Sequence, residues 1–274
     1  MLKKASIAGL LFLVAVLVSC GGGAEIDPIV QNAVFRSASP DDGTSGIRAA
    51  GLNGNIIRDV RLENLAYGLK IGSGAQSHGL QIRDVIATNN SQALFVANLS
   101  DSQFNNLDLQ SYFLPDAPSG SKNHVIYLER GNHNLTFDNV VLSGGSGQTL
   151  QMYCYQNRDE PSDYIAFDGL IIENANHGPI VISGGYSHVT IKNLTATAIG
   201  NEFPVIQLYG DAADITIDGF ECWGGQALLG TADGPSAHAR NVVLKNGIYH
   251  GTTLVYGASK IDGLVIDPSV RLEP

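Results

Sequence analysis

A repeat of about 25 residues constrains the fold of this chain more than any other feature of its sequence. In each copy an apolar residue is followed two positions later by Asp, Asn or Gly. The residue two positions before it is usually apolar as well, so that apolar residues alternate with residues of any type. The apolar position falls at Ile57, Ile82, Phe104, Phe137, Phe167, Ile191, Ile217, Leu244 and Ile261. Self-similarity at such a period is the signature of a solenoid, in which each repeat is buried against its neighbours.

The pattern inside each copy predicts strands rather than helices. Alternation of apolar residues is the period of a β-strand. Asp, Asn and Gly tolerate left-handed backbone, so the second position predicts a bend. Further turn residues follow at Asn64, Asn89, Asn90 and Asn174, where we expect a stacked, structural ladder. A last short strand then recurs, as in residues 126–128 and 180–182. We therefore predict an all-β chain whose residues 47–274 form a single-stranded right-handed parallel β-helix of about nine coils, rather than a propeller or sandwich.

With these coils, residues 56–270 resemble the pectin-lyase-like superfamily of right-handed parallel β-helices. The stretch 124–128, followed by 147–153, is similar to a signature of many secreted β-helix proteins. Members of the superfamily include polysaccharide lyases, glycoside hydrolases, epimerases, phage tailspikes and adhesins. The resemblance therefore implies the fold and does not choose an activity.

The N-terminal residues predict export and lipid anchoring. Lys3 and Lys4 precede an apolar run, residues 7–18, that is too short to span a bilayer. The residues Leu-Val-Ser-Cys at 17–20 resemble a lipobox, which implies a signal peptide at 1–19 and a lipid on Cys20. Residues 20–46 would then be the lipidated cysteine, a tether and a lead-in. The expected location is the cell envelope, at the outer membrane in a Gram-negative host; the alternative is an ordinary signal peptide with a chance cysteine.

Charge and cysteine content limit the partners. The net charge of −10 argues against a nucleic acid, and an acidic polysaccharide would need a local cationic site or a bound cation. Cys154 and Cys222 fall about three coils apart, so we predict two thiols rather than a disulfide. The chain ends soon after the ninth coil, and an uncapped coil exposes a strand edge, so end-to-end association is left open.

One outward face concentrates side chains that suit sugar binding. On the last strand of each coil the central outward row is expected to read Lys70, Phe95, Tyr127, Gln151, Val181, Gln207, Leu229 and Val255. Adjoining positions add Glu129, Tyr153 and Tyr209 on one side, and Tyr67, Gln92, His124, Gln148 and Gln226 on the other. Two insertions, 112–123 and 155–163, would flank this face. Aromatic rings stack on sugars and amides bond hydroxyls, so we predict a polysaccharide partner. The predicted substrate contacts are Lys70, Gln148, Gln151, Tyr153, Gln207 and Tyr209.

The same face could carry catalysis by either of two routes. A lyase needs a base, here His124 or a Tyr127 tyrosinate, and a cation such as Lys70, Arg130, Arg158 or Ca²⁺ to neutralise a uronate. A hydrolase needs two carboxylates, and Glu129 could pair with Asp116, Asp159 or Glu160. The candidate catalytic residues are therefore His124, Tyr127, Glu129 and Arg158, and no metal or cofactor motif is expected.

Two non-catalytic interpretations stand beside these. His124 could simply cap a turn, and the protein could be an envelope or adhesion module that presents a rigid surface. The outward row next to the bend mixes charges of both signs and predicts a solvated face: Arg58, Arg83, Asn105, Asp138, Asp168, Lys192, Asp218, Lys245 and Asp262.

Overall fold

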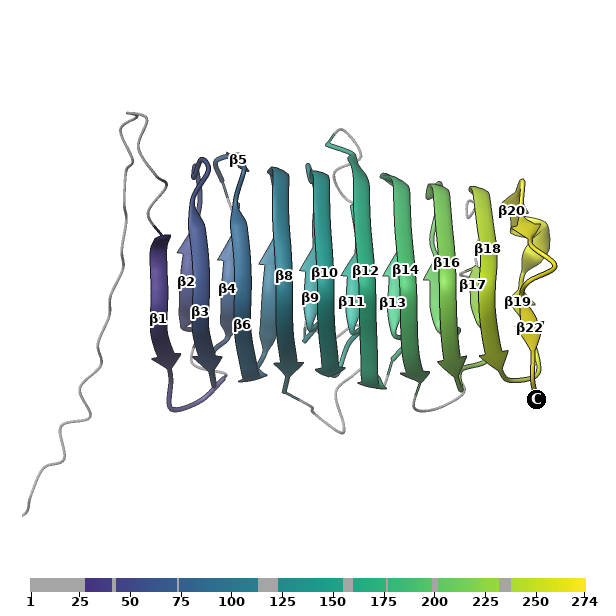
Figure 1. Cartoon of the computed structure of the whole chain (residues 1–274), viewed down its shortest axis with the longest axis horizontal. Helices are drawn as coiled ribbons and strands as arrows, with labels where there is room; N and C mark the ends of the chain where they lie inside the picture. Colours follow the sequence, from purple (N-terminus) through teal and green to yellow (C-terminus); the bar gives the residue numbers. More distant parts are fainter. Residues whose placement is uncertain are drawn as a thin grey trace, which may run out of the picture.

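The computed structural model describes residues 28–40, 43–72, 74–112, 123–154, 160–175, 177–198, 202–231 and 238–274. These residues form an elongated parallel β-solenoid whose coils follow one another along the chain (Figure 1). Each coil contributes one long strand to one sheet and one short strand to a second sheet. The fold is all-β, as predicted, and within the described ranges no helix is long and apolar enough to cross a membrane.

The long-strand sheet contains 13 strands in parallel pairing. In spatial order they are β1 (Pro28–Arg36), β3 (Ile56–Glu63), β6 (Gln81–Asn90), β8 (Leu99–Ser111), β10 (His133–Gly144), β12 (Ser162–Ala175), β14 (Tyr186–Ala198), β16 (Ala213–Trp223), β18 (Ala239–His250) and β20 (Ile261–Asp262), with β5 (Ser77–His78) beside β8, and β21 (Val265–Ile266) and β22 (Arg271–Leu272) beside β18. Strand β1 lies within the 20–46 segment, so parallel stacking begins at Pro28.

The short-strand sheet contains nine strands. They are β2 (Ser45–Ala49), β4 (Tyr67–Ile71), β7 (Gln92–Val96), β9 (Ile126–Leu128), β11 (Leu150–Met152), β13 (Ile180–Ile182), β15 (Ile206–Leu208), β17 (Leu229–Thr231) and β19 (Val255–Tyr256), after which a 3₁₀ turn, η1 (Ala258–Lys260), follows. From β2 to β19 the chain makes about eight turns, which is close to the nine coils predicted.

The predicted bends are confirmed as left-handed residues. All nine have positive φ, from 51° at Asn193 to 77° at Gly219. The asparagine side chains of this row bond to the preceding coil: Asn246 Nδ2 donates to Asp218 Oδ1 at 2.8 Å. Asn139 shows what the bend does, because the buried residues of β10 are 135 and 137 before it and 140 and 142 after it. The left-handed residue therefore shifts the alternation by one position and keeps both halves of the strand facing the core.

The turn ladder predicted after the second strand is also present. Asn89 Nδ2 donates to Asn64 Oδ1 at 2.7 Å, and both residues are left-handed. Asn90 turns inward instead, where its Nδ2 donates to the Leu62 carbonyl and its Oδ1 accepts from the Leu65 N–H. These asparagines hold backbone geometry and are structural.

The ninth copy of the repeat does not align with the other eight. Ile261 pairs with Ala239, whereas Leu244 pairs with Ile266, so the last interval is 22 residues and not 17. Gly263 instead ends a second left-handed row at the start of each long strand. Its other members are Gly54, Gly79, Asp101, Asn134, Tyr164, His188, Asp214 and Asn241. Both rows favour the same residue types, so spacing alone does not distinguish them.

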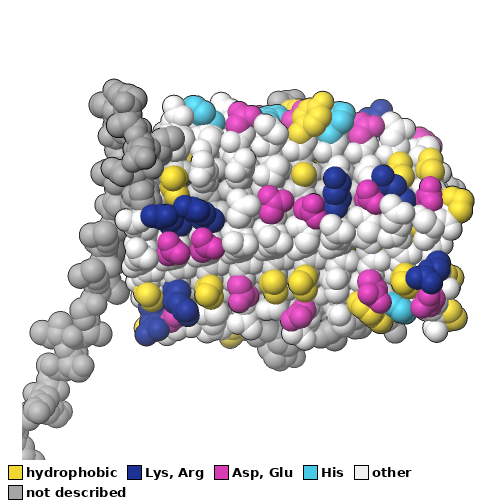
Figure 2. All heavy atoms as spheres, viewed as in Figure 1, with side chains coloured by type: hydrophobic (Ala, Val, Ile, Leu, Met, Phe, Trp, Pro, Cys, Tyr) yellow, Lys and Arg dark blue, Asp and Glu magenta, His cyan; other side chains and the backbone are white. Residues whose placement is uncertain are grey.

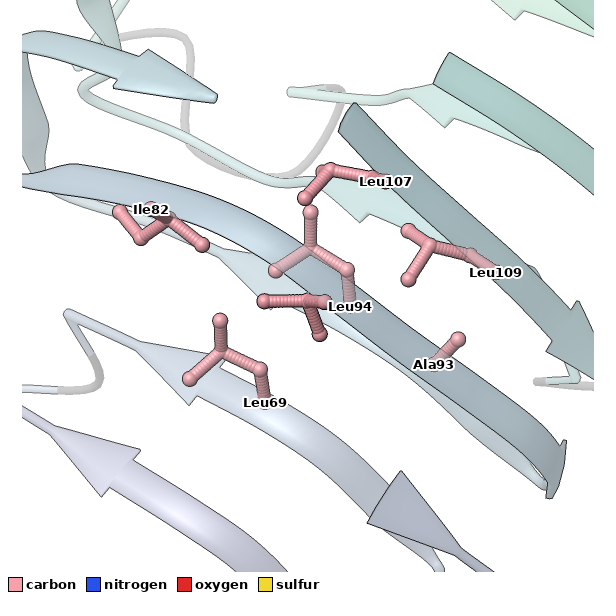
Figure 3. A pocket seen from close by; sticks show the side chains of 7 residues that line it. Leu69, Ile82, Ala93, Leu94, Leu107 and Leu109 are labelled. Carbon is pink, nitrogen blue, oxygen red and sulfur yellow. The ribbon is translucent and has the colours of Figure 1, made fainter. Parts of the chain in front are cut away.

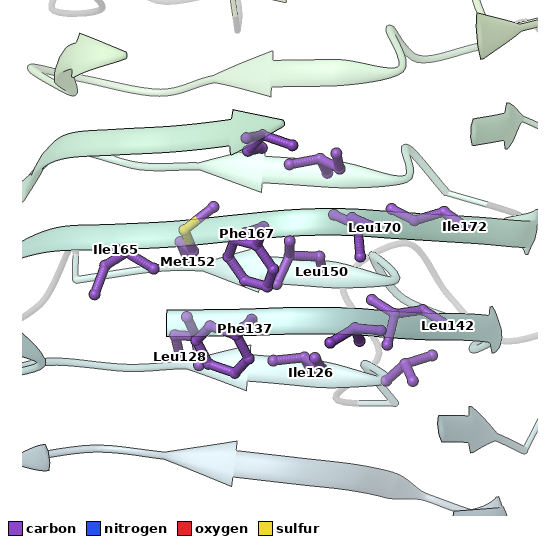
Figure 4. Packing of buried hydrophobic residues seen from close by; sticks show 14 of the residues in the cluster. Ile126, Leu128, Phe137, Leu142, Leu150, Met152, Ile165, Phe167, Leu170 and Ile172 are labelled. Atoms are coloured by element: carbon purple, nitrogen blue, oxygen red, sulfur yellow. The ribbon is translucent and has the colours of Figure 1, made fainter. Parts of the chain in front are cut away.

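Ladders of apolar side chains fill the space between the sheets (Figure 4). Phe137 stacks between two other phenylalanines, with ring centroids 4.3 Å from Phe104 and 4.5 Å from Phe167. All three rings are almost completely buried. Cys154 and Cys222 are buried thiols, as predicted, and pack as small apolar residues.

The outer face of the long-strand sheet carries the charged row predicted for it. Figure 2 shows this row as a band of basic and acidic side chains along the rod. The register confirms it from Arg58 to Lys245, and Lys245 Nζ lies 3.2 Å from Asp218 Oδ2. Asp262 is not part of the row, because it pairs with Arg240. Exposed ion pairs contribute about 0–1 kcal/mol each, so this row adds little to the stability of the fold.

Candidate functional site

The central outward row of the short-strand sheet is aligned by parallel register. Lys70 pairs with Phe95, Phe95 with Tyr127 and Tyr127 with Gln151. The row then passes through Val181 to Gln207. Four predicted site residues, Lys70, Tyr127, Gln151 and Gln207, therefore stand in one line.

The last two members of this row were predicted wrongly. Gly230 pairs with Gln207, and Tyr256 with Gly230. Leu229 pairs with Ile206 and is fully buried, and Val255 follows it on the inner side. The error has a simple cause: Ala227, Leu228 and Leu229 are all apolar and give no alternation to read.

The flanking positions also align. The backbone N–H of Glu129 donates to the Val96 carbonyl at 2.8 Å, which places Glu129 one coil beyond Ala97. The N–H groups of Tyr153 and Tyr209 bond the preceding coils in the same way. On the other side His124 contacts the Gln148 backbone of the next coil. The predicted contacts on this face thus lie on neighbouring coils.

Aromatic rings form a continuous floor over the middle coils. The Phe95 ring lies edge-on to Tyr67 at 6.4 Å and to Tyr127 at 5.6 Å between centroids. The His124 ring follows at 5.5 Å from Tyr127. Lys70 Nζ sits 4.4 Å from the Tyr67 centroid and 5.0 Å from that of Phe95, so a cation lies over the floor. Burial and the Arg48 charge lower the pKa of Lys70, while Glu129 raises it.

His124 is held as a neutral ring with a defined tautomer. Its Nδ1 lies 3.1 Å from the Gln148 carbonyl oxygen, which can only accept, so Nδ1 carries the proton and Nε2 is left as an acceptor. Burial lowers the pKa of His124 to about 4, although the bond to Gln148 acts in the opposite direction. The bond joins two coils, so it also performs the turn-capping role considered for this residue.

Tyr127 is a proton donor rather than a base. Burial, followed by the nearby Glu129 charge, raises the pKa of Tyr127 to about 12. Its hydroxyl is therefore protonated at neutral pH, and the tyrosinate route is disfavoured. Tyr209, also half-buried, has its pKa raised by burial and by Tyr153.

Of the remaining predicted residues, four are not described by the structure and two pair with each other. Arg158, Asp116, Asp159 and the lipidation candidate Cys20 lie outside the described residues. Arg130 Nε and Glu160 Oε2 pair with each other at 2.9 Å. In the part of the chain that the structure describes, no group of three or more His, Cys, Asp or Glu side chains could hold a metal ion.

Gln92, in the flanking row, has a buried amide without a hydrogen-bond partner. It pairs with Tyr67 and stands one coil before His124, and only 4% of its surface is exposed. Its Nε2 is buried and donates no hydrogen bond. A buried donor without a partner costs about 1–3 kcal/mol, so this amide lowers the stability of the fold and does not offer its Nε2 to a ligand. The sequence placed Gln92 in the row but gave no sign of this unmet bond.

The apolar gap between the sheets is not a ligand site. Figure 3 shows it lined by Leu69, Ile82, Ala93, Leu94, Leu107 and Leu109. It contains no polar lining and no space for a water molecule. It is a packing defect behind the outer face.

Comparison with known proteins establishes the architecture. No protein-family model and no curated protein matches the sequence. The tailspike gp61 of Pseudomonas phage phi297 matches 80% of this chain and 43% of its own, with 12% identity and a TM-score of 0.52. Geobacillus virus E2 ORF18 matches 88% and 50%, with 12% identity and a TM-score of 0.50. The fold is a parallel β-helix. At these identities the likeness shows the fold alone, and the chain spans about half the length of these two proteins.

Within this β-helix the candidate residues make a surface of mixed chemistry. Tyr67, Phe95 and Tyr127 supply apolar rings, and Lys70 supplies a cation. His124 Nε2 can accept a hydrogen bond, and the protonated Tyr127 hydroxyl can donate one. Both kinds of polar group therefore lie beside one aromatic floor.

Proposed function

We propose that the outer face of the short-strand sheet binds a polysaccharide chain. The observation that carries this proposal is the aligned row of aromatic and amide side chains on successive coils, centred on Phe95, Tyr127 and Gln151. A sugar ring has an apolar face that packs on aromatic rings and a rim of hydroxyls that needs donors and acceptors. A polymer of such rings fits a surface whose coils repeat every 4.8 Å or so.

The polar groups supply complementary bonds for hydroxyls. A sugar hydroxyl both donates and accepts, and His124 Nε2 can accept a hydrogen bond from it. Tyr127 can donate one to it, because the Tyr127 hydroxyl stays protonated. Since the row also contains Gln151, recognition of several hydroxyls in sequence is the natural use of this face.

The local charge favours an acidic sugar at one end of the face. The whole chain carries a net charge of −10, which would repel an anionic polymer. Arg48 and Lys70 are paired neighbours at the N-terminal end of the row, whereas Glu129 lies farther along it. A carboxylate on the glycan would therefore bind nearest Lys70.

A second candidate is a polysaccharide lyase acting on the same face. This candidate is favoured because a base and an acid lie next to each other. His124 is a neutral base and Tyr127 a protonated acid, and their ring centroids are 5.5 Å apart. His124 Nε2 would take the proton from the carbon next to the uronate carboxylate. The bond from the adjacent carbon to the glycosidic oxygen would break, a C=C bond would form, and Tyr127 would protonate the leaving oxygen. The low pKa of His124 makes it a weak base, so binding is the primary proposal.

A glycan screen of the chain from residue 24, which lacks the predicted signal peptide and Cys20, tests both. Affinity electrophoresis reports binding, ultraviolet absorbance reports unsaturated uronates, and a reducing-end assay reports cleavage. Binding without product supports the binding function, and a rise in both product signals supports the lyase. Reducing ends alone indicate a hydrolase, and no binding to any polysaccharide refutes the proposal.

We also propose that the protein is held at the cell envelope by a lipid on Cys20. The lipobox-like residues 17–20 support this, and no other part of the argument depends on it. Mass spectrometry of the exported protein should find a diacylglyceryl group on Cys20. A Cys20→Ser variant should lose the lipid and leave the membrane fraction, and an unmodified N-terminus in the native protein would contradict the proposal.

A further inference from the structure

Trp223 stands on the outer face of the long-strand sheet, away from the row proposed to bind a polysaccharide. It is the last residue of β16, and the residue before it, Cys222, is buried in the core, so Trp223 points outward. The Trp223 side chain is exposed, with 36% of the residue's surface accessible. Tryptophan is usually highly buried in folded proteins, so the core does not account for its presence here.

The Trp223 ring is held in place by His250 of the following coil. Parallel register pairs the two residues, and their rings stack with centroids 4.8 Å apart and planes 7° apart. His250 Nε2 lies 3.2 Å from Glu221 Oε1, which fixes the imidazole in turn. Because the orientation of the indole ring is set in advance, a ligand that packs on it orders little of the protein.

The opposite face of the Trp223 ring is turned toward the preceding coil. The stack runs along the rod, because the 4.8 Å between the two centroids matches the spacing of parallel strands. On the preceding coil Thr197 pairs with Trp223, and Thr195 pairs with Glu221. Both threonines are exposed. A short side chain is therefore all that the register places against this face of the ring.

The groups around the ring suit a sugar. The apolar face of a sugar packs on an aromatic ring, while its hydroxyls need donors and acceptors. Thr195 and Thr197 each offer a hydroxyl that both donates and accepts, and the Glu221 carboxylate accepts. The indole N–H of Trp223 adds a donor at the edge of the ring. An apolar surface and hydroxyl partners thus lie side by side.

The charge around the ring selects an uncharged sugar. Glu221 lies two residues before Trp223, and Glu173 lies on the coil before Thr197, between the paired residues 172 and 175. These carboxylates would repel a uronate, in contrast to Lys70 on the other sheet. A simple cation would be attracted, but it would leave the threonine hydroxyls without a partner.

We propose that the outward face of Trp223, with the two threonines and Glu221 beside it, is a second carbohydrate site that binds one uncharged sugar unit. One ring and a few solvent-exposed hydrogen bonds give weak binding, with a Kd on the order of 1 mM. A site of this strength adds to a polysaccharide contact made elsewhere on the rod and does not replace it. It shares no residue with the short-strand face and stands independently of that proposal.

Tryptophan fluorescence tests the site directly, because Trp223 is the only tryptophan in the chain. The chain from residue 24 is titrated with malto-, cello- and xylo-oligosaccharides, which are uncharged, and with oligogalacturonates. At least one neutral series should change the emission in a saturable way, and the oligogalacturonates should bind more weakly. Thr197→Phe should abolish the response, because its ring would cover the face of Trp223 that the sugar needs.

Thr190→Phe is the matched control. Thr190 lies on the same strand, also points outward and pairs with Thr216 rather than with Trp223, so this variant should keep the wild-type response. Trp223→Ala removes the reporter, and ligand-observed NMR should then show binding at least about fivefold weaker than in the wild type, because the stacking contact is lost.

The absence of a saturable change with all three neutral series would overturn the proposal, and so would tighter binding of oligogalacturonates. A response that survives in Thr197→Phe, or one that is lost in Thr190→Phe, would show that the signal does not come from this site. The double variant Tyr127→Ala with Gln151→Ala should keep the full response. Its loss there would assign the sugar to the short-strand face and overturn the second site.

Discussion

Buried His124 should make the stability of this protein depend on pH in a specific window. Its pKa falls from 6.5 in an exposed histidine to about 4 in the folded protein, chiefly through burial. The unfolded chain therefore binds the proton more tightly, and lowering the pH favours unfolding. The contribution is fully present above pH 6.5 and is lost progressively as the pH falls from there to about 4.

The size of the effect follows from the shift. One pKa unit corresponds to about 1.4 kcal/mol, so the whole shift is worth about 3 kcal/mol of unfolding free energy. Integration between pH 7.5 and pH 5 gives a loss of about 2 kcal/mol from this residue alone. Because His124 is only 7% exposed, solvent screening reduces this figure little.

Urea unfolding at pH 7.5 and pH 5 measures this contribution. His124→Gln keeps a polar side chain that cannot titrate, so the variant should lose about 2 kcal/mol less than the wild type between the two pH values. His78→Gln changes an exposed histidine and should keep the wild-type pH dependence. Equal pH dependence in the wild type and His124→Gln would refute the assignment of His124 as a buried neutral ring.

Three further predictions test the fold and the face. Phe137→Ala should lower the unfolding free energy by about 3–5 kcal/mol by thermal or urea denaturation, whereas outward-facing Val141→Ala should cost far less. Asn139→Ala should cost about 1–2 kcal/mol more than Asn139→Gly in the same assay, because the residue is left-handed. Gln92→Leu should stabilise the protein by about 1 kcal/mol in the same assay, since it removes an unmet donor; a loss of stability would contradict the assignment of this amide as unsatisfied.

The architecture could be predicted because the repeated coils of a solenoid require a repeated pattern of residue types in its sequence. Asp59, Asn106 and Asn139 mark bends that only a few residue types tolerate, and the apolar residues before them mark the core. The prediction failed where this pattern of bend and apolar residues is ambiguous. Leu228 and Leu229 show no alternation, and Gly263 belongs to the other left-handed row, so the register of the last coils was misread.

The candidate site was predicted in outline for the same reason. Parallel register brings Lys70, Tyr127 and Gln151 into line whatever their function. Its chemistry depends on packing, which the repeat does not encode. The tautomer of His124 comes from a carbonyl 24 residues away, and the unmet bond of Gln92 comes from how its neighbours pack.

Binding by matched surface variants tests the central claim most directly. Tyr127→Ala with Gln151→Ala changes the short-strand face, and Tyr164→Asn with Gln110→Ala changes exposed residues of the long-strand sheet. With a polysaccharide that the wild type binds, the first pair should weaken binding at least about tenfold, because it removes an aromatic contact and hydrogen bonds. The second pair should bind like the wild type. Full binding by the first pair, or loss only in the second, would contradict the account.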